Sequence, residues 1–215
     1  RNATDYGHLM TENIVQEIKK LNCIVISGLA YGIDSISHRS CIEKHIPTFG
    51  VLGHGLDMIY PKEHFDLAQK MKEEGGLVTE YFTKTEPSAY NFPHRNRIIA
   101  GLSDLIIVVE AAKTGGALVT ARLANDYNRE VLAVPGRYGD KYSEGCNFLI
   151  ESNRAAIMAD THSISRIMNW EEIPQTIELF KKEDDKGKNL KGNEKKVYEI
   201  IKARKEINID DISIA

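Results

Sequence analysis

The sequence lacks the features that mark several large classes of protein. Its 215 residues include three cysteines, Cys23, Cys41 and Cys146, and none belongs to a CxxC pair. This argues against a disulfide framework and favours reduced, buried thiols in a cytoplasmic protein. No apolar run approaches the length of a membrane span, and the N-terminus has no signal-peptide pattern. The net charge is only −3, so affinity for a polyanion must come from a local basic site.

Signatures of catalysis and of cofactor binding are missing as well. The GxGxxG dinucleotide fingerprint, the GxxxxGK[ST] P-loop and the GxSxG nucleophile turn do not occur. The seven histidines show no ligand spacing such as HExxH. We therefore expect no bound metal and no cofactor.

Apolar, β-branched runs alternate with helical patterns along the chain. The runs are nearly continuous, as in strands covered on both faces, and lie at 23–27, 48–52, 76–80, 104–110, 130–135 and 155–159. Helices are predicted at 7–21, 34–44, 62–74, 93–102, 116–127, 144–152 and 161–169. This alternation predicts an α/β fold with a doubly wound, mostly parallel, Rossmann-like sheet.

The composition changes towards the C-terminus. Residues 181–196 read KKEDDKGKNLKGNEKK, which is typical of a solvated linker, and apolar residues then recur at helical spacing. We predict a core over 1–175, a linker over 176–193 and the start of a small helical domain over 194–215. Arg1 at one end and an apolar-periodic segment at the other indicate a fragment of a longer protein.

Two glycine-containing loops follow predicted strands. In an open parallel sheet, ligands bind beyond the carboxyl ends of the strands. Glycine lets backbone N–H groups approach a ligand, and a helix start adds the positive end of its dipole, which suits phosphate. One loop reads SGLAYGID, with Asp34 as the predicted helix cap, and the other reads KTGG. The candidate phosphate-binding residues are Ser27, Gly28, Gly32, Lys113, Thr114, Gly115 and Gly116.

The stretch NFPHRNRIIAGLSD, residues 91–104, places two arginines in the first turn of a predicted helix. Positive charge is unfavourable there, so Arg95 and Arg97 indicate an anion in front of the helix, with Asn96 as a neutral donor. The alternative is that these arginines pair with Glu80 or Glu110 at strand ends.

Tyr90 and Phe92 precede the arginines on the chain. They are candidates either for core anchors or for the stacking of exposed nucleic-acid bases. Contacts to backbone phosphate carry no sequence information, so we expect binding that tolerates any sequence and weakens with salt.

Six sequence blocks, in their order and spacing, resemble the bacterial DNA-processing protein A family, also called DprA or Smf. The blocks are SGLAYGIDSISH, VLGHGLDMIYP, GGLVTEY, FPHRNRIIAGLSDLIIVVEA, TGGALVTARLANDYNREVLAVPG and SEGCNFLIE. The resemblance covers Arg1 to about Ala159. It implies an extended Rossmann fold whose first strand and glycine precede Arg1, and it makes Arg1 a phosphate-facing residue. Residues from Glu194 onward resemble the first half of a winged-helix domain.

The resemblance also implies a function. Members of this family bind single-stranded DNA without catalysing a reaction, protect incoming strands in natural transformation, help to load the RecA recombinase and act as homodimers. The expected partners are therefore single-stranded DNA, RecA and a second copy of the chain, with no membrane involved.

Two other functions are compatible with the sequence. Phosphoribohydrolases that act on nucleoside monophosphates use a similar sheet and a glycine-pair turn, but they place a glutamate where this chain has Ala117, Leu118 and Val119. The other alternative is a regulator whose terminal domain binds duplex DNA while the core senses a nucleotide. Release of a free base would favour the enzyme. The regulator predicts duplex binding by the whole terminal domain, which this fragment should lack.

Overall fold

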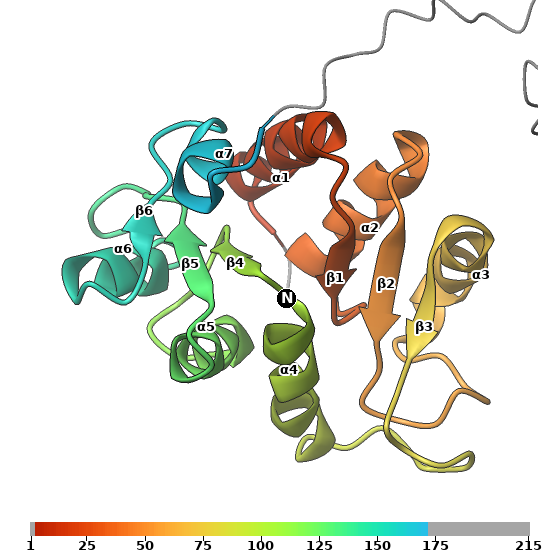
Figure 1. Cartoon of the computed structure of the whole chain (residues 1–215). Helices are drawn as coiled ribbons and strands as arrows, with labels where there is room; N and C mark the ends of the chain where they lie inside the picture. The colour runs from red at the N-terminus through yellow and green to blue at the C-terminus, as the bar shows by residue number, and fades with distance from the viewer. Residues whose placement is uncertain (1–2, 172–215) are drawn as a thin grey trace, which may run out of the picture. The chain divides into compact units, whose positions relative to one another are not determined.

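The computed structural model describes residues 3–171, so Arg1, the predicted linker and the predicted terminal domain lie outside the described residues. Helices and strands alternate along the chain, which confirms the predicted α/β fold (Figure 1). The elements are α1 (Asp5–Ile18), η1 (Lys19–Leu21), β1 (Val25–Ser27), α2 (Ile33–Glu43), β2 (Thr48–Val51), η2 (Lys62–His64), α3 (Phe65–Glu74), β3 (Gly76–Val78), α4 (Asn91–Leu102), β4 (Leu105–Val108), α5 (Gly116–Asp126), β5 (Glu130–Ala133), α6 (Glu144–Glu151), β6 (Ala156–Ile157) and α7 (Ser163–Met168).

The strands form two three-stranded sheets, ordered β1-β2-β3 and β4-β5-β6, in which every neighbouring pair is parallel. Strands β1 and β4 are the inner edges of the two sheets and face each other (Figure 1). The spatial order β3-β2-β1-β4-β5-β6 is that of a doubly wound fold, with the switch between β1 and β4. The sequence predicts a single sheet, whereas the hydrogen-bonded ladder is interrupted at this switch.

An apolar cavity of about 1390 Å³ lies where the ladder is interrupted. It is lined by Ile26 of β1, Ile106 of β4, Ile14 of α1 and Ile99 of α4. Helix α1 begins beside the end of β4, because the backbone N–H of Thr4 donates to the Glu110 carboxylate over 3.2 Å. The strand predicted ahead of Arg1 stays a prediction.

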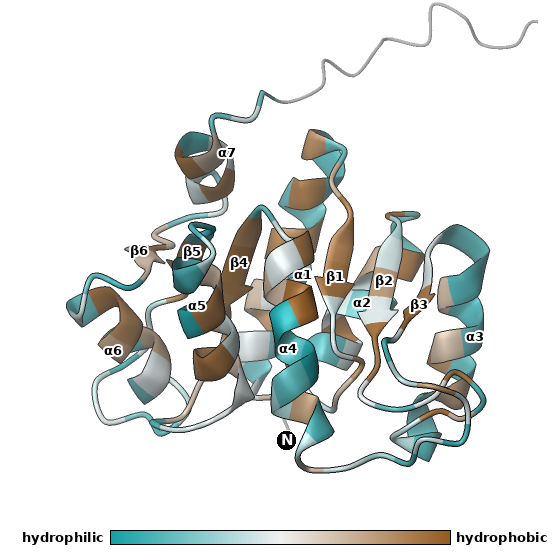
Figure 2. Ribbon diagram, turned by 60° about the horizontal axis from the view of Figure 1, so that its bottom comes forward, coloured by the Kyte–Doolittle hydropathy of each residue, from teal (hydrophilic) through white to brown (hydrophobic). Residues whose placement is uncertain are grey.

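The two faces of the sheets are covered by different helices. Along β5, Val131 and Ala133 pack with buried residues of α4, α5 and α6, whereas Leu132 and Val134 pack with residues of α1 and α7. This alternation follows from the two-residue period of a strand. Figure 2 shows the strands as a mostly hydrophobic layer between helices that carry hydrophilic stretches. The chain at β5 is therefore held from both sides, whereas both residues of β6 are exposed.

The helices begin at residues that suit a helix start. The side chain of Thr4 caps α1 by accepting the N–H of Gly7 over 3.1 Å, and Asp5 follows in the first turn. Helix α4 begins at Asn91, which places Pro93 in its first turn, where proline is tolerated. Within residues 3–171, no helix has both the length and the apolar content needed to cross a membrane.

Candidate nucleic-acid interface

The predicted site residues gather at one edge of the fold. The arrowheads of β1, β2 and β4 point to the same edge in Figure 2, and helices α2, α4 and α5 start there. Side chains connect these starts: Asn96 of α4 donates its Nδ2–H to the carbonyl of Gly116 at the start of α5 over 3.3 Å. We call this region the carboxyl edge; it comprises the loops 28–32, 52–61, 79–90, 109–115 and 134–143 and the helix starts beside them.

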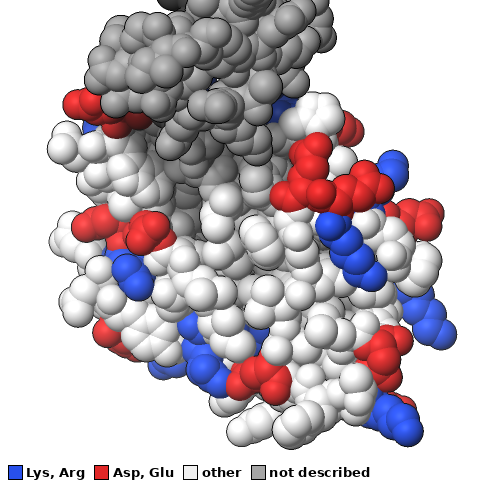
Figure 3. Space-filling view, turned by 45° about the vertical axis from the view of Figure 1, so that its right-hand side comes forward, with Lys and Arg blue, Asp and Glu red and all other residues white. Residues whose placement is uncertain are grey.

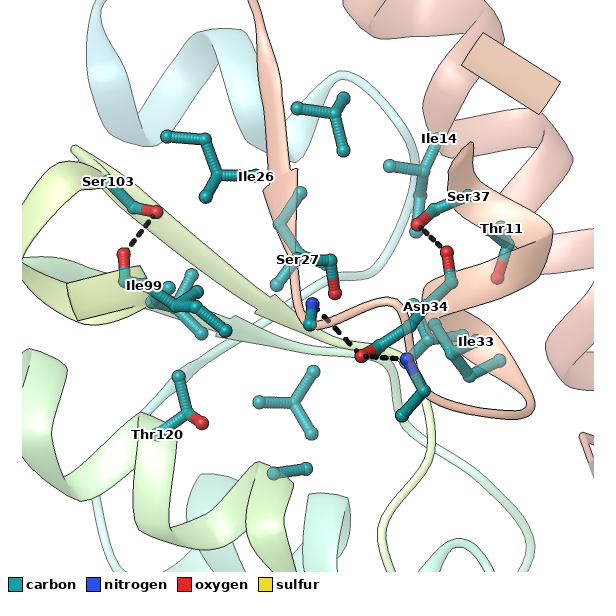
Figure 4. A pocket seen from close by; sticks show the side chains of 18 of the residues that line it. Thr11, Ile14, Ile26, Ser27, Ile33, Asp34, Ser37, Ile99, Ser103 and Thr120 are labelled. Carbon is teal, nitrogen blue, oxygen red and sulfur yellow. Dashed lines mark hydrogen bonds between the residues drawn. The ribbon is translucent and has the colours of Figure 1, made fainter. Parts of the chain in front are cut away.

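The loop after β1, residues 27–34, is closed by an internal anion. One carboxylate oxygen of Asp34 accepts the N–H of Gly28 over 3.0 Å and the N–H of Ala30 over 3.2 Å (Figure 4). Helix α2 starts at Ile33 with Gly32 as its N-cap, so Asp34 is a first-turn residue and not the predicted cap. Gly32 has φ of 90°, a conformation that glycine adopts without strain.

We call residues 27–34 the closed turn. Its N–H groups of Gly28 and Ala30 already bind a carboxylate, so a phosphate would have to displace Asp34 to use them. This differs from the prediction that Ser27 and Gly28 provide a phosphate-binding turn. The sequence did contain a signal, because an aspartate six residues after Gly28 can fold back onto the turn.

Arg95 points into the protein. Its side chain is only 5% exposed, and Nη1–H donates to the carbonyls of Gly28, over 2.9 Å, and of Val51. Its Nε–H donates to Oδ1 of Asn96 over 3.1 Å. Burial lowers the pKa of Arg95, and the nearby Asp34 carboxylate offsets part of that effect. Arg95 therefore joins the ends of β1 and β2 to α4, and its predicted contact with phosphate stays a prediction.

The same contact accounts for the glycine at position 28. A Cβ at Gly28 would lie 2.5 Å from Nη2 of Arg95, closer than non-bonded atoms approach. Gly28 thus makes room for the buried guanidinium, which is a different reason from the predicted approach of a ligand.

Arg97, two residues later, points outward. It forms a salt bridge with Glu80, and its side chain is 42% exposed. His94 Nδ1 lies 3.4 Å from the other oxygen of Glu80. This pairing is the alternative that the sequence left open for the arginines. Glu110, the other carboxylate considered, contacts Thr4 and not the arginines.

The loop after β4 has no internal anion on its helix start. Helix α5 begins at Gly116 with Gly115 as its N-cap, has no side-chain cap and has no acidic residue in its first turn. Lys113 is 80% exposed on its side chain and forms a long salt bridge with Glu144, in which Nζ and Oε1 are 3.7 Å apart. We call residues 113–116 the open turn. It joins an exposed cation, the Thr114 hydroxyl and an uncapped helix dipole, a combination that attracts anions.

The two predicted stacking residues differ in exposure. Tyr90 is 78% exposed and stacks on His94, with ring centroids 6.2 Å apart. Phe92 is half-buried and stacks on Tyr60 at 5.6 Å. Tyr60 was not singled out from the sequence, although it stands beside a proline in a glycine-rich loop of the carboxyl edge.

The described part of the chain contains no group of three histidine, cysteine, aspartate or glutamate residues arranged to hold a metal ion. The three cysteines are free thiols, and burial raises the pKa of both Cys41 and Cys146 to about 12. These two thiols are therefore protonated and unsuited to metal binding or nucleophilic attack at neutral pH.

Residues 1–169 match the family described as DNA recombination-mediator protein A. The chain is 39% identical over 167 residues to Protein Smf of Synechocystis, covering 78% of this chain and 42% of that protein. It is 41% identical over 157 residues to DNA processing protein DprA of Bacillus subtilis, covering 73% of this chain and 53% of that protein. The chain thus spans about half the length of the curated relatives it matches.

Two solved structures of DNA processing protein A also resemble this chain. DNA processing protein A of Streptococcus pneumoniae has a TM-score of 0.70 at 32% identity, covering 78% of this chain and 58% of that one. DNA processing protein A of Helicobacter pylori, whose structure concerns its single-stranded DNA binding mode, has a TM-score of 0.71 at 27% identity, covering 78% and 77%. The resemblance carried by the six sequence blocks is therefore confirmed.

Proposed function

The chain belongs to the DNA recombination-mediator protein A family, and on that basis we propose that it binds single-stranded DNA through its carboxyl edge without sequence preference. The observation that carries the proposal is the open turn, where Lys113 and Thr114 stand at the uncapped start of α5. The Helicobacter pylori relative, described for its single-stranded DNA binding, supports the choice of ligand.

Backbone phosphate is the group that this site suits. Lys113 supplies charge, Thr114 a hydroxyl donor, and Gly115 and Gly116 leave the helix start accessible to an oxygen. Asn96 and Arg97 lie on the neighbouring α4, and Arg1, outside the described residues, is a further proposed phosphate contact. On the face shown in Figure 3, positive and negative side chains are interspersed and form no broad basic surface there.

We propose that the protein acts by binding and not by hydrolysis. In the described residues, the carboxylate that ends β4, Glu110, is engaged by the backbone and the hydroxyl of Thr4 at the start of α1. The first turn of α5 carries Ala117, Leu118 and Val119 where the related phosphoribohydrolases place their acid. Incubation with nucleoside monophosphates should therefore release no free base, and measurable release would support the enzyme instead.

The role in the cell follows from the family. We propose that the protein works in bacterial natural transformation in the cytoplasm, protecting incoming single strands and assisting the loading of RecA. The relatives named as DNA processing proteins support the general role. RecA as a partner and a homodimer that shares one strand between two sites are part of the proposal; a dimer would raise affinity through avidity.

The test is a titration of labelled single-stranded and duplex oligonucleotides of one sequence by fluorescence anisotropy across a salt series. We expect tighter binding to the single strand, and each phosphate contact should contribute roughly 0.7 to the slope of log affinity against log salt. Lys113→Ala should lower that slope by one contact. Lys72→Ala is the matched control, because Lys72 lies in the last turn of α3, away from the carboxyl edge. Equal affinity for duplex, or a flat salt response, would refute the proposal.

A further inference from the structure

Aromatic side chains cluster on the part of the carboxyl edge formed by the loops after β2 and β3. We define the aromatic shelf as Tyr60, Phe82, Tyr90, Phe92 and His94. Phe82 is 88% exposed. Single exposed apolar residues are ordinary, but several in adjoining loops indicate a surface that binds a ligand or a partner molecule. The shelf lies beyond β2 and β3, whereas the open turn follows β4, so the two are separate features of one edge.

The shelf contains aromatic pairs that are already parallel. The rings of Tyr60 and Phe92 are inclined by 24°, and those of Tyr90 and His94 by 14°. In each pair, stacking occupies one face of a ring and holds its orientation. An exposed ring such as that of Tyr90 therefore has a second face available for another flat group.

Hydrogen bonds hold the loops of the shelf together. The N–H of Gly55 donates to the carbonyl of Thr85 over 3.0 Å, and Nδ2–H of Asn91 donates to the carbonyl of Gly53 over 3.1 Å. The N–H of Lys84 donates to both oxygens of Asp57, over 2.9 and 3.0 Å. These hydrogen bonds join the two loops to each other and join the loop after β2 to the start of α4. The exposed rings are therefore already positioned, and less conformational entropy is lost when a ligand binds.

The charges around the shelf are mixed, with both lysines and carboxylates in its loops. Two of the carboxylates beside it are engaged: Asp57 by the Lys84 N–H, and Glu80 by Arg97 and His94. Lys84 and Glu86 are exposed on the loop after β3, and Lys62 and Glu63 are exposed at the start of η2. The exposed flat rings, and not the charge, are therefore what matches a ligand with unpaired bases.

We propose that the aromatic shelf is a second contact for the single strand, which stacks unpaired bases on Phe82 and Tyr90 while the open turn holds backbone phosphate. The inference rests on the proposed function and adds to it a contact with the bases themselves. The continuity of α4 supports this occupant, because its first turn carries shelf residues and its Asn96 reaches the open turn. Duplex DNA keeps its bases stacked internally, so the shelf also accounts for a preference for single strands.

The experiment compares an oligothymidylate of about 20 nucleotides with an abasic strand of equal length. The wild-type chain should bind the oligothymidylate about tenfold or more tightly than the abasic strand, because stacking contributes substantially for each base. The double variant Phe82→Ala/Tyr90→Ala should lose that difference while its affinity for the abasic strand and its salt slope stay unchanged. Tyr127→Ala, an exposed aromatic at the end of α5, is the matched control and should behave as the wild type.

The outcomes separate the shelf from the proposed function. If the double variant binds both strands as the wild type does, while Lys113→Ala weakens binding to both, the shelf is refuted and the phosphate site stands. If the wild-type chain binds neither strand, both proposals fail. If the double variant changes only self-association in sedimentation, the shelf is a protein contact and the inference is wrong. A melting curve for each variant confirms that replacing these exposed rings leaves the fold unchanged.

Discussion

The closed turn and the open turn look alike in sequence and differ in chemistry. Both follow a parallel strand, both contain glycines and both lead into a helix of eleven residues, α2 or α5. In the closed turn, the Asp34 carboxylate binds the N–H groups of Gly28 and Ala30, whereas the open turn has no acidic residue at its helix start. Glycine spacing alone therefore does not identify a phosphate site. A glycine-containing turn before a helix is available to phosphate where no carboxylate of the chain already binds its N–H groups.

The two turns are expected to have different roles, one in stability and the other in binding. The closed turn and the groups around it, Arg95 and His38 among them, should contribute to stability. The open turn should contribute to binding and little to stability. Substitutions at each turn can test whether the closed turn contributes to stability and the open turn to binding, because stability and DNA affinity are measured separately.

The largest expected effect is that of Arg95→Ala on folding. The change removes the donors to the carbonyls of Gly28 and Val51 and leaves a cavity, so the free energy of unfolding should fall by about 3 to 5 kcal/mol. Denaturation in urea, followed by circular dichroism, measures it. Arg97→Ala is the matched control; its half-exposed salt bridge should contribute less than about 1 kcal/mol. A similar loss of stability in the two variants would contradict the inward role of Arg95.

Sequence periodicity could have separated these arginines. Arg95 stands four residues before the buried Ile99 and so shares its face of α4, whereas Arg97 lies two positions away on a different face. The helix dipole indicated an anion near both arginines and left open which of them contacts it directly. The destination of Arg95, two carbonyls at the ends of β1 and β2, could not be predicted, because it depends on how α4 crosses the sheet.

The fold was more accessible to sequence reasoning than the site. Continuous apolar runs identify buried parallel strands, and the predicted start of α5 at Gly116 is confirmed. The role of Asp34 was not predicted, since an aspartate near a helix start is as readily a cap as a partner for the preceding turn. Tyr90 and Phe92 of the shelf were candidates from the sequence, whereas Tyr60 and Phe82 were not, because they come from separate loops that only the folded chain brings together.

The pH dependence of stability gives a second, smaller effect on the side of the closed turn. His38 of α2 is fully buried, and its Nδ1 lies 2.7 Å from Oγ1 of Thr48, whose hydroxyl donates to the carbonyl of Val25. Nδ1 therefore carries the proton of a neutral ring. Burial lowers the pKa of His38 from 6.5 to about 4; Asp34 opposes this change, and His64 and Arg95 add to it.

Because the folded pKa of His38 is depressed, its contribution to stability is complete above about pH 6.5. As the pH falls towards 4, the unfolded chain takes up a proton that the folded chain does not. At about 1.4 kcal/mol per pH unit, the loss should approach 3 kcal/mol near pH 4. Urea denaturation at pH 7, 6 and 5 measures the slope, and His38→Gln should reduce it. An equal slope in the variant would show that other groups cause the acid sensitivity.

The smallest effect, about 2 kcal/mol, is expected on binding when the open turn is given an anion of its own. Thr114→Asp places a carboxylate one residue before Gly115, the N-cap of α5, and so gives the open turn an anion of its own. Since a charge at a helix end contributes up to about 2 kcal/mol, the affinity for single-stranded DNA should fall roughly 30-fold, while the folded state gains slightly from negative charge at the positive end of the helix dipole. Anisotropy titration and urea denaturation of one protein sample measure both. Thr114→Asn, similar in shape but neutral, should retain most of the affinity, because the loss comes from charge. If the aspartate variant binds as tightly as the asparagine variant, phosphate does not lie at this helix start, and the contrast between the two turns has no bearing on DNA.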